Sequence, residues 1–153
     1  MAGIMKPKRI AKRPSPVRGK VGIVIAEWNE EITLALLSGA KDFLLRSGIP
    51  ASRIIEQLVP GSFELPLAAQ RLAMKKDMAG VICIGCLVKG DTPHFDYISQ
   101  AVSHGIMNVG LKFNKPVVFG VLTVNTLQQA IERAGGKLGN KGEEAAATLL
   151  RMI

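Results

Sequence analysis

The chain has little of what holds a secreted scaffold or a membrane protein together. Its 153 residues include two cysteines, too few for a fold stapled by disulfides. The longest apolar runs, near 81–88 and 117–122, are far shorter than the ~20 residues that cross a bilayer, which excludes a membrane-spanning protein. Aromatic residues are scarce at 5%, but apolar residues together make up 48% of the chain, enough to fill one core. The sequence therefore indicates one globular domain of ordinary size.

Acidic residues are missing from the first twenty positions, which hold seven of the 20 basic residues. Residues 21–153 carry 13 basic and 12 acidic residues, so the net charge of +8 comes almost entirely from residues 1–20. The segment has three prolines and no aromatic residue, and it cannot bury enough apolar surface to offset the entropy lost on ordering. We predict a flexible basic arm over 1–20 and a single domain over 21–153.

The sequence of this arm leaves its role open. It could contact an anionic partner weakly, act as a transit peptide with unusually little serine, or be a solvated tail without a role, which is the simplest interpretation. Binding of a nucleic acid through the arm is a further alternative, but the folded body is nearly neutral. We therefore expect neither a nucleic-acid partner nor a membrane partner.

Strand-like and helix-like segments alternate along the chain. Continuous apolar runs predict buried strands at 21–26, 54–59, 81–88 and 117–122. Helical spacing predicts helices at 30–47, 63–76 and 95–112, one that starts after Thr126, and a last one at 143–152. This alternation is typical of a four-stranded parallel sheet with helices on both faces, the three-layer α/β/α sandwich of flavodoxin-like proteins. Ligands of such sheets bind beyond the carboxyl ends of the strands, so the loops there form the candidate site.

Two of these loops hold aromatic and polar residues but are ambiguous on their own. Trp28, the only tryptophan, follows the first strand between two polar neighbours; it is either a core aromatic or a flat ring that lines a pocket. The loop at 60–66 sets turn-forming residues beside an aromatic residue and a carboxylate at a helix start, where unpaired N–H groups favour oxygen acceptors. Ser62 in this loop could equally be a helix cap.

The loop after the third strand, at 89–95, carries the strongest signal. Gly90 and Thr92 lie between a strand and a helix start, an arrangement that forms a competent anion cradle. The loop lacks the length and the Gly-Lys-Ser/Thr ending of a nucleotide-binding P-loop, so a single phosphate is the expected ligand. His94 follows two residues after Thr92. Because histidine can take and return a proton near neutral pH, His94 is the candidate catalytic residue.

Other reactive side chains have simpler interpretations. Cys83 and Cys86 have Cys-x-x-Cys spacing but lie within a strand, where three residues of extended chain separate their Cα atoms by about 10 Å, beyond disulfide reach. No second cysteine pair completes a zinc site, so we expect reduced thiols, a cytoplasmic protein and no metal. Arg133 and Lys141 stand at helix ends, where exposed basic residues are common, and His104 is expected to pack or cap within its helix.

Taken in order, these motifs resemble the lumazine synthase family, which makes 6,7-dimethyl-8-ribityllumazine in riboflavin biosynthesis. The resemblance runs from about Val21 to the last helix and leaves the arm outside. The motifs that carry it are Trp28-Asn29, Pro60-Gly61-Ser62-Phe63-Glu64-Leu65-Pro66, Gly90-Asp91-Thr92-Pro93-His94-Phe95-Asp96-Tyr97, Phe119-Gly120-Val121-Leu122-Thr123, Gln129-Ala130-Ile131-Glu132-Arg133-Ala134-Gly135 and Gly139-Asn140-Lys141-Gly142.

The resemblance implies a transferase that condenses 5-amino-6-(D-ribitylamino)uracil with 3,4-dihydroxy-2-butanone 4-phosphate, and that releases phosphate and water without a metal or an organic cofactor. His94 would shuttle protons as a Schiff base forms between the two substrates and phosphate leaves. Asp91 would act through its backbone N–H, because its carboxylate repels phosphate. The phosphate-binding residues implied are Gly90, Asp91, Thr92 and Arg133.

The resemblance also assigns residues to the pyrimidine substrate. Trp28 would stack on its ring, at a position where many relatives carry phenylalanine, and Phe119 would cover the ring. The remaining substrate-binding residues implied are Ser62, Phe63 and Glu64 for the ribityl chain, and Cys86, Leu87, Val88 and Lys141 for the pocket, where Cys86 to Val88 would act chiefly through backbone groups.

A homo-oligomer is implied as well, because in this family Phe119 and Arg133 come from a neighbouring subunit. Family members form pentamers, and some close twelve pentamers into a shell of sixty subunits. The stretch 136–142 looks like the shell-forming pattern, whereas Pro14, Pro16 and the short C-terminus leave the choice open. The main alternative is a non-catalytic member that carries a flavin or a lumazine, and the presence of His94, Arg133 and Lys141 together argues against it. A second alternative is a generic flavodoxin-like protein that binds phosphate or a flavin.

Overall fold

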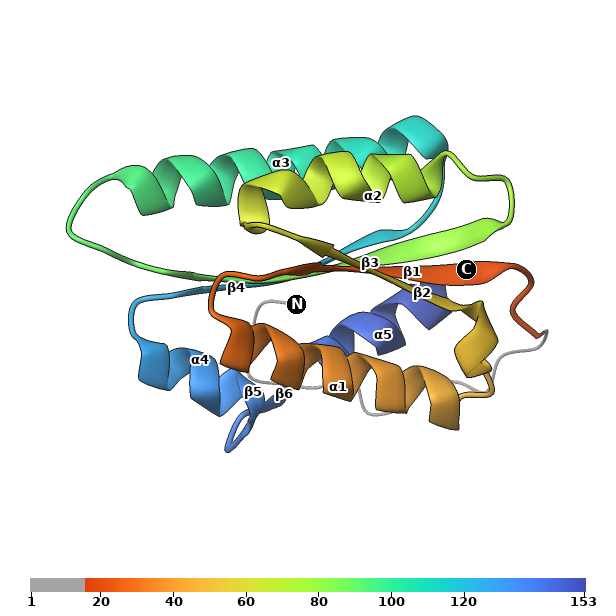
Figure 1. Ribbon diagram of the computed structural model, residues 1–153, viewed down its shortest axis with the longest axis horizontal. Coiled ribbons are helices and arrows are strands. Elements are labelled where there is room, and N and C mark those ends of the chain that lie inside the picture. The colour runs from red at the N-terminus through yellow and green to blue at the C-terminus, as the bar shows by residue number, and fades with distance from the viewer. Residues whose placement is uncertain (1–15) are drawn as a thin grey trace.

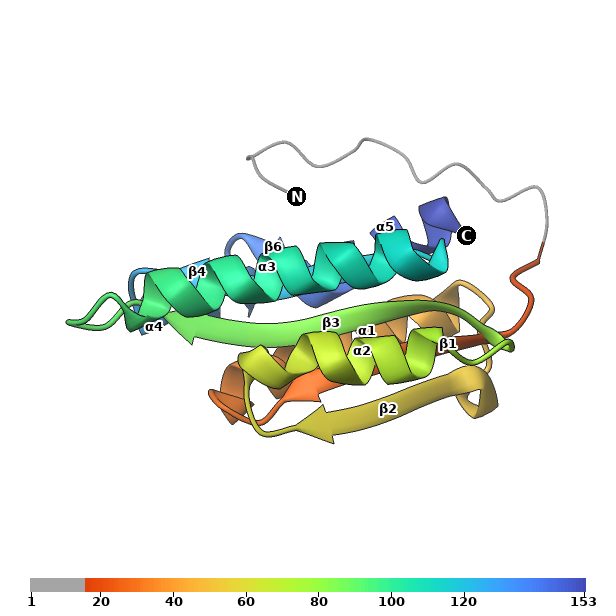
Figure 2. The same cartoon turned by 90° about the horizontal axis from the view of Figure 1, so that it is seen from above.

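Four parallel strands form the middle layer of the structure, in the order β2-β1-β3-β4 (Figure 1). They are β1 (Lys20–Ala26), β2 (Ile54–Val59), β3 (Met78–Val88) and β4 (Val117–Val124). This computed structural model describes residues 16–153. Strands β1 and β3 lie inside the sheet and are buried along most of their length, which explains their continuous apolar sequence. The carboxyl ends of all four strands form one edge of the sheet, on the left in Figure 2.

Helices cover both faces of this sheet. On one face lie α2 (Leu65–Ala73) and α3 (His94–Phe113), and on the other lie α1 (Glu30–Arg46), α4 (Leu127–Arg133) and α5 (Lys141–Met152) (Figure 1). Short 3-10 turns, η1 (Ala51–Arg53) and η2 (Ser62–Glu64), precede β2 and α2, and a hairpin of β5 (Ala134–Gly136) and β6 (Gly139–Asn140) joins α4 to α5. The expected three-layer sandwich around a four-stranded parallel sheet is therefore confirmed.

Each helical layer has its own apolar core, because successive side chains of a strand point to opposite faces of the sheet. In β1, Ile23 faces the layer of α1 and α5, where it joins Leu36 and Leu149 in one buried cluster. The next residue, Val24, faces the layer of α2 and α3 and joins Leu72 in the other cluster. The two cores fix the helices on the sheet, and so fix the turns that connect helices to strands.

Most element boundaries lie close to those expected, and the differences have local causes. β3 begins at Met78 instead of 81, because Met78 still pairs with Lys20 of β1. The helix expected over 63–76 begins as the turn η2 and ends at Ala73. The helix α4 is capped as expected, since the Thr126 hydroxyl accepts the N–H of Gln129 at 3.2 Å. The hairpin β5–β6 was not expected from the sequence.

The last helix, α5, starts two positions before the expected 143 because Asn140 caps it. The Asn140 Oδ1 atom accepts the N–H groups of Gly142 and Glu143, at 2.8 and 3.1 Å. Its Nδ2 atom donates to the carbonyl of Ala35 in α1, at 3.0 Å. One asparagine side chain thus binds both α1 and α5.

Residues 1–15 of the expected arm lie outside the described part of the chain, and the positions that follow are held against the body. Val17 is buried, and the Arg53 guanidinium donates to the carbonyls of Val17 and Gly19, the latter at 2.7 Å. Lys20 begins β1 and pairs with Asp77 at 2.8 Å. Among the described residues, contacts with the folded body therefore begin at Val17.

Close packing of α1 against α5 depends on two glycines. A Cβ atom on Gly142 would overlap the carbonyl of Leu36, and a Cβ atom on Gly39 would overlap the side chain of Asn140. The absence of side chains at these two positions lets Asn140 reach α1, and it sets the direction in which α5 leaves the hairpin.

Gly39→Ala should therefore destabilise the protein, although alanine favours a helix by about 1 kcal/mol over glycine. The added methyl group displaces Asn140, so we expect a net loss of about 2 kcal/mol in the free energy of unfolding. The measurement is the melting temperature at a fixed protein concentration. Ser38→Ala, at the exposed neighbouring position, is the control and should stay within about 0.5 kcal/mol of the parent. A raised melting temperature for Gly39→Ala would contradict this packing.

Candidate active site

The ends of β1 and β2 bring an indole and a carboxylate together. The backbone N–H of Trp28 donates to the carbonyl of Pro60 at 3.3 Å, which fastens the turn after β1 to the end of β2. Gly61 lies beside both side chains, since a Cβ atom there would be 3.3 Å from Trp28 Cδ1 and 3.2 Å from Glu64 Oε2. The Trp28 side chain is 74% exposed. It is therefore not a core aromatic but a flat apolar face open to a ligand.

The 3-10 turn η2 holds three expected substrate-binding residues, whose side chains differ in exposure and in contacts. Ser62 is only 4% exposed, and its hydroxyl lies over Gly85 of β3, where a side chain on the glycine would collide with it. Its hydroxyl therefore faces the sheet, which leaves its backbone as the part that can meet a ligand. Phe63 is exposed at 58%. Glu64 accepts the N–H of Gly61 through Oε2, at 3.0 Å, so its carboxylate also closes the loop.

The end of β3 is tied to its neighbours on both sides. The Asn29 side-chain amide donates to the carbonyl of Cys86 at 2.8 Å, and the N–H of Lys89 donates to the carbonyl of Val124 at 2.8 Å. Cys86 is buried, whereas Leu87 and Val88 are partly exposed at this edge. The bond made by Asn29 was not expected from the sequence, where the only hint is an amide residue between a strand and a helix.

The phosphate loop expected after β3 is exposed and runs directly into α3. A Cβ atom on Gly90 would meet nothing within 4 Å, and Asp91 and Thr92 are exposed as well. His94 is the first residue of α3, and its N–H lies 3.4 Å from the Thr92 hydroxyl oxygen. The start of a 20-residue helix gives this loop a partial positive charge that suits an anion.

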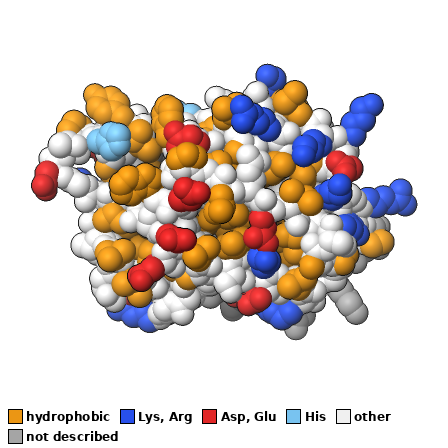
Figure 3. Space-filling view, in the orientation of Figure 1, with side chains coloured by type: hydrophobic (Ala, Val, Ile, Leu, Met, Phe, Trp, Pro, Cys, Tyr) orange, Lys and Arg blue, Asp and Glu red, His pale blue; other side chains and the backbone are white. Residues whose placement is uncertain are grey.

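We call the side chains at this edge the strand-end cluster: Trp28, Phe63, Glu64 and His94. The space-filling view shows hydrophobic side chains gathered around a histidine at the upper left, at the carboxyl edge of the sheet (Figure 3). Strands β1, β2 and β3 each deliver part of the cluster. Its surface combines an aromatic face, a carboxylate, a histidine and an anion cradle.

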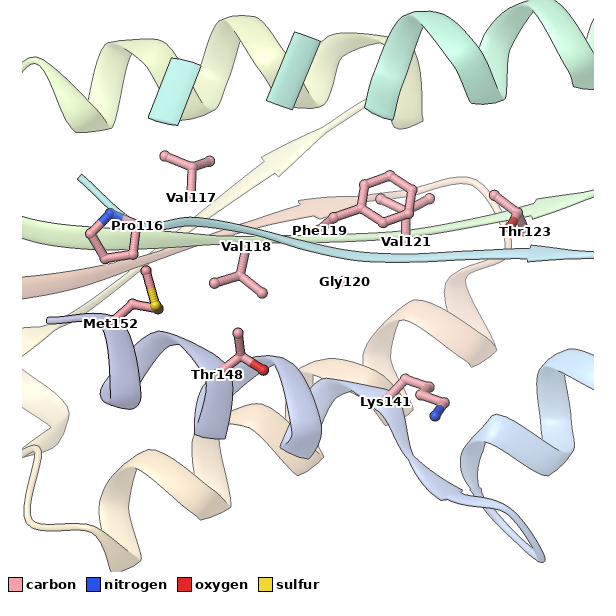
Figure 4. Close-up of a pocket in the computed structure, with 10 residues that line it drawn as sticks. All are labelled: Pro116, Val117, Val118, Phe119, Gly120, Val121, Thr123, Lys141, Thr148 and Met152. Carbon is pink, nitrogen blue, oxygen red and sulfur yellow. The ribbon is translucent and has the colours of Figure 1, made fainter. Parts of the chain in front are cut away.

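Phe119 and Lys141 lie elsewhere, in a groove along the open edge of β4 (Figure 4). Phe119 is in the middle of β4 and points to the same side as Val117 and Val121, while Lys141 approaches from the start of α5. The Lys141 ammonium pairs with Glu144 Oε2 at 2.8 Å, and both side chains are about one-fifth exposed. We refer to this feature as the β4-edge groove.

Arg133 ends α4 and is held by its own helix. Its Nη1 atom donates to the carbonyl of Gln129 at 2.9 Å and lies 3.8 Å from Glu132 Oε2. In residues 16–153, both of these contacts use Nη1, so the rest of the guanidinium fork faces away from them. A planar fork held at one end suits bidentate binding of phosphate.

Within one chain, the β4-edge groove does not complete the strand-end cluster. Phe119 pairs with Cys83, whereas Cys86 pairs with Leu122, so Phe119 lies about 10 Å back from Cys86 along the strand direction. In the other direction, β3 separates β4 from β1, which adds about 10 Å between Phe119 and the strand that ends at Trp28. A single flat ligand cannot contact both aromatic residues of the same chain.

The thiol groups of the two cysteines are buried in the sheet. Both thiols are free and lie in β3. Burial raises the pKa of Cys83 to about 12 and that of Cys86 to about 11, so both stay protonated at neutral pH. In residues 16–153, no group of three or more His, Cys, Asp or Glu side chains is placed to hold a metal ion. Nor is any helix of this range long and apolar enough to span a membrane.

The fold is that of the α/β proteins built on a parallel sheet, and the strand-end cluster lies at the carboxyl edge, where enzymes of this class commonly bind their ligands. A family model described as 6,7-dimethyl-8-ribityllumazine synthase matches residues 18–153. The chain belongs to the 6,7-dimethyl-8-ribityllumazine synthase family, a family of transferases, and the resemblance seen in its motifs is confirmed.

Curated relatives agree with this assignment. The chain is 61% identical to the 6,7-dimethyl-8-ribityllumazine synthase of Cytophaga hutchinsonii over 132 residues, which cover 86% of this chain and 83% of the relative. It is 55% identical to the synthase of Porphyromonas gingivalis, over 87% of this chain and 83% of the relative. It is 48% identical to the synthase of Parabacteroides distasonis, over 92% and 88%.

Both thiols should resist an aromatic disulfide reagent at pH 8 in the folded protein and react fully in urea, because burial removes both access and thiolate. The measurement is the absorbance of the released aromatic thiol. Folding raises both pKa values above the ordinary 9.0, because the buried thiols are favoured in their neutral form. The stability that burial of the neutral thiols contributes is therefore complete below pH 9 and is lost as the pH rises toward 12. Rapid labelling of either thiol in the folded protein would contradict the burial.

Proposed function

We propose that the strand-end cluster catalyses the condensation of 5-amino-6-(D-ribitylamino)uracil with 3,4-dihydroxy-2-butanone 4-phosphate to 6,7-dimethyl-8-ribityllumazine, with release of phosphate and water. The observation that carries the proposal is the position of His94. It is the first residue of α3, directly after the exposed Gly90–Thr92 loop, at the edge where Trp28 is also exposed. A proton carrier, an anion cradle and an aromatic face thus share one edge of the sheet.

The pyrimidine is proposed to stack on Trp28, whose indole offers a broad exposed face. Its ribityl chain then extends over η2, where the backbone of Ser62 and Phe63 and the carboxylate of Glu64 are available to its hydroxyl groups. Only Oε2 of Glu64 is engaged by the Gly61 N–H, so Oε1 can accept from the ribityl chain. Leu87 and Val88 close the pocket from the end of β3.

The phosphate of the second substrate is proposed to sit in the loop Gly90 to Thr92, against the first N–H groups of α3. Asp91 contributes its backbone N–H, and its exposed side chain is free to point away from the anion. His94 then lies beside the reacting carbonyl. It takes a proton as the amine adds and returns it to the hydroxyl group that leaves as water when the Schiff base forms. It then takes a second proton from the carbon next to the imine and gives it to the phosphate as the C–O bond to phosphate breaks.

Phe119, Arg133 and Lys141 are proposed to come from a neighbouring copy of the chain. The separation of the β4-edge groove from the strand-end cluster supports this, since one chain alone lacks a second aromatic face over the pyrimidine. The assembly proposed is a homo-oligomer, a pentamer or a shell built from pentamers, with active sites between adjacent copies. The free thiols of β3 fit a reducing compartment, and we propose the cytoplasm.

The direct test is turnover of purified protein with both substrates, followed by the fluorescence of the lumazine product over the uncatalysed background. A clear enhancement supports the proposal. Protein that binds the pyrimidine tightly but gives no enhancement would instead be a carrier of a lumazine or a flavin.

His94→Ala should lower kcat by about 100-fold without abolishing turnover, because general acid–base catalysis contributes typically 10²–10⁴-fold while positioning by the pocket remains. The matched control is His104→Ala, which removes the other histidine, an exposed residue farther along α3. The measurement is kcat of the parent, His94→Ala and His104→Ala from steady-state rates. If kcat of His94→Ala equals that of the parent, the proton-carrier role is wrong.

Trp28→Ala and Arg133→Ala should each be nearly inactive alone at low substrate concentration, but co-expressed chains should recover activity. If each site takes Trp28 from one copy and Arg133 from the next, random mixing leaves about a quarter of the sites intact. If both residues of a site came from the same chain, no intact site would form, because every chain carries one of the two substitutions. Activity of the co-purified mixture, against the two variants mixed after separate purification, measures the recovery. No gain on co-expression would place both residues in one chain.

A further inference from the structure

Asn29 has an unusual backbone for its place in the turn between β1 and α1. Its φ of 60° and ψ of 48° lie in the left-handed region, which residues other than glycine rarely adopt. In residues 16–153, the one other non-glycine residue with positive φ is Asn114, directly after α3. An asparagine in this conformation is common after a helix, but the residue before a helix normally has an extended backbone.

The side chain of Asn29 does not cap α1, the usual use of an asparagine at this position. Instead, its Nδ2 atom donates across the sheet to the carbonyl of Cys86 at 2.8 Å, between residues 57 apart in the sequence. The ladder between β1 and β3 ends at the pair Ile25 and Ile84. The bond from Asn29 therefore attaches the turn to β3 beyond the last ladder pair.

The orientation of Trp28 depends on this turn. The Trp28 N–H is fastened to the carbonyl of Pro60 on the β2 side, and the next residue is fastened to Cys86 on the β3 side. The indole is 74% exposed, with Gly61 at one edge, so side-chain packing within the chain restrains it little. The backbone of residues 28 and 29 therefore sets the direction in which the Trp28 side chain leaves the turn, and so limits the orientations open to the ring.

We propose that Asn29 is a positioning residue for the pyrimidine substrate, because its left-handed backbone and its bond to Cys86 hold the Trp28 indole in the stacking orientation. The same bond engages the Cys86 carbonyl at the end of β3. This inference rests on the proposed function, which supplies the ligand.

Two substitutions separate the backbone from the amide. Asn29→Gly keeps the left-handed conformation and removes the donor, so the turn can still form. Asn29→Asp keeps the shape of the side chain but sets a carboxylate against the Cys86 carbonyl. The matched control is Asn114→Gly, the same change at the other left-handed asparagine, which follows the far end of α3.

Trp28 is the only tryptophan, so its fluorescence reports on the ring itself. The first readout is the anisotropy decay of the free proteins, which measures how freely the indole moves. The second is quenching on titration with 5-amino-6-(D-ribitylamino)uracil, which gives Kd for the pyrimidine alone. The third is the pair of KM values in turnover.

Both Asn29 variants should show a more mobile indole and a Kd for the pyrimidine raised about tenfold, the upper range for one lost hydrogen bond. KM for the butanone phosphate should change less than about twofold, since the phosphate loop is untouched. Asn114→Gly should match the parent in all three readouts.

The proposal is overturned if both Asn29 variants keep the parent's anisotropy decay and Kd, even with a lowered melting temperature, because that result describes a purely structural residue. Failure of the proposed function has a different signature, the absence of turnover in the parent protein. Ring mobility in the free proteins would still decide whether Asn29 holds Trp28.

Discussion

The parallel pairing of β1 with both of its neighbours is the constraint on which the candidate site depends. Because β1 lies between β2 and β3 and runs the same way, three strand-to-helix turns emerge side by side. Trp28, Glu64 and His94 are far apart in the sequence, and each follows a different strand of this trio. The two apolar cores, one on each face of the sheet, hold the strands in register and so keep the three turns at one edge of the sheet.

Much of this arrangement follows from short-range sequence patterns and could be predicted. Apolar runs mark buried strands because both faces of a parallel sheet are covered, and a cap such as Thr126 acts over three residues. The rule that ligands bind at carboxyl ends of strands then selects the loops that hold Trp28 and His94. The sequence pattern alone left Trp28 between a core and a pocket role, and its exposure in the structure excludes the core.

What could not be predicted depends on contacts between distant residues. The Asn29 amide finds its acceptor 57 positions away, and that of Asn140 finds its acceptor 105 positions away. Neither partner can be read from spacing, because each depends on how two elements pack. The hydroxyl of Ser62 likewise faces the sheet only because Gly85 leaves room for it on the neighbouring strand. Local patterns give the residue types of the site, and tertiary packing decides which of their atoms face a ligand.

The strand-end cluster and the β4-edge groove are unlike surfaces at different edges of one chain. If the groove of one copy completes the cluster of the next, the contact is heterologous, and it repeats from copy to copy until the rotation closes a ring. A two-fold dimer, in which each patch meets itself, would leave both clusters uncovered. Every member of a closed ring both gives and receives a partial site, whereas an open arc has one complete site fewer than it has chains. Closing the ring would thus complete the last active site, in addition to fixing the shape of the assembly.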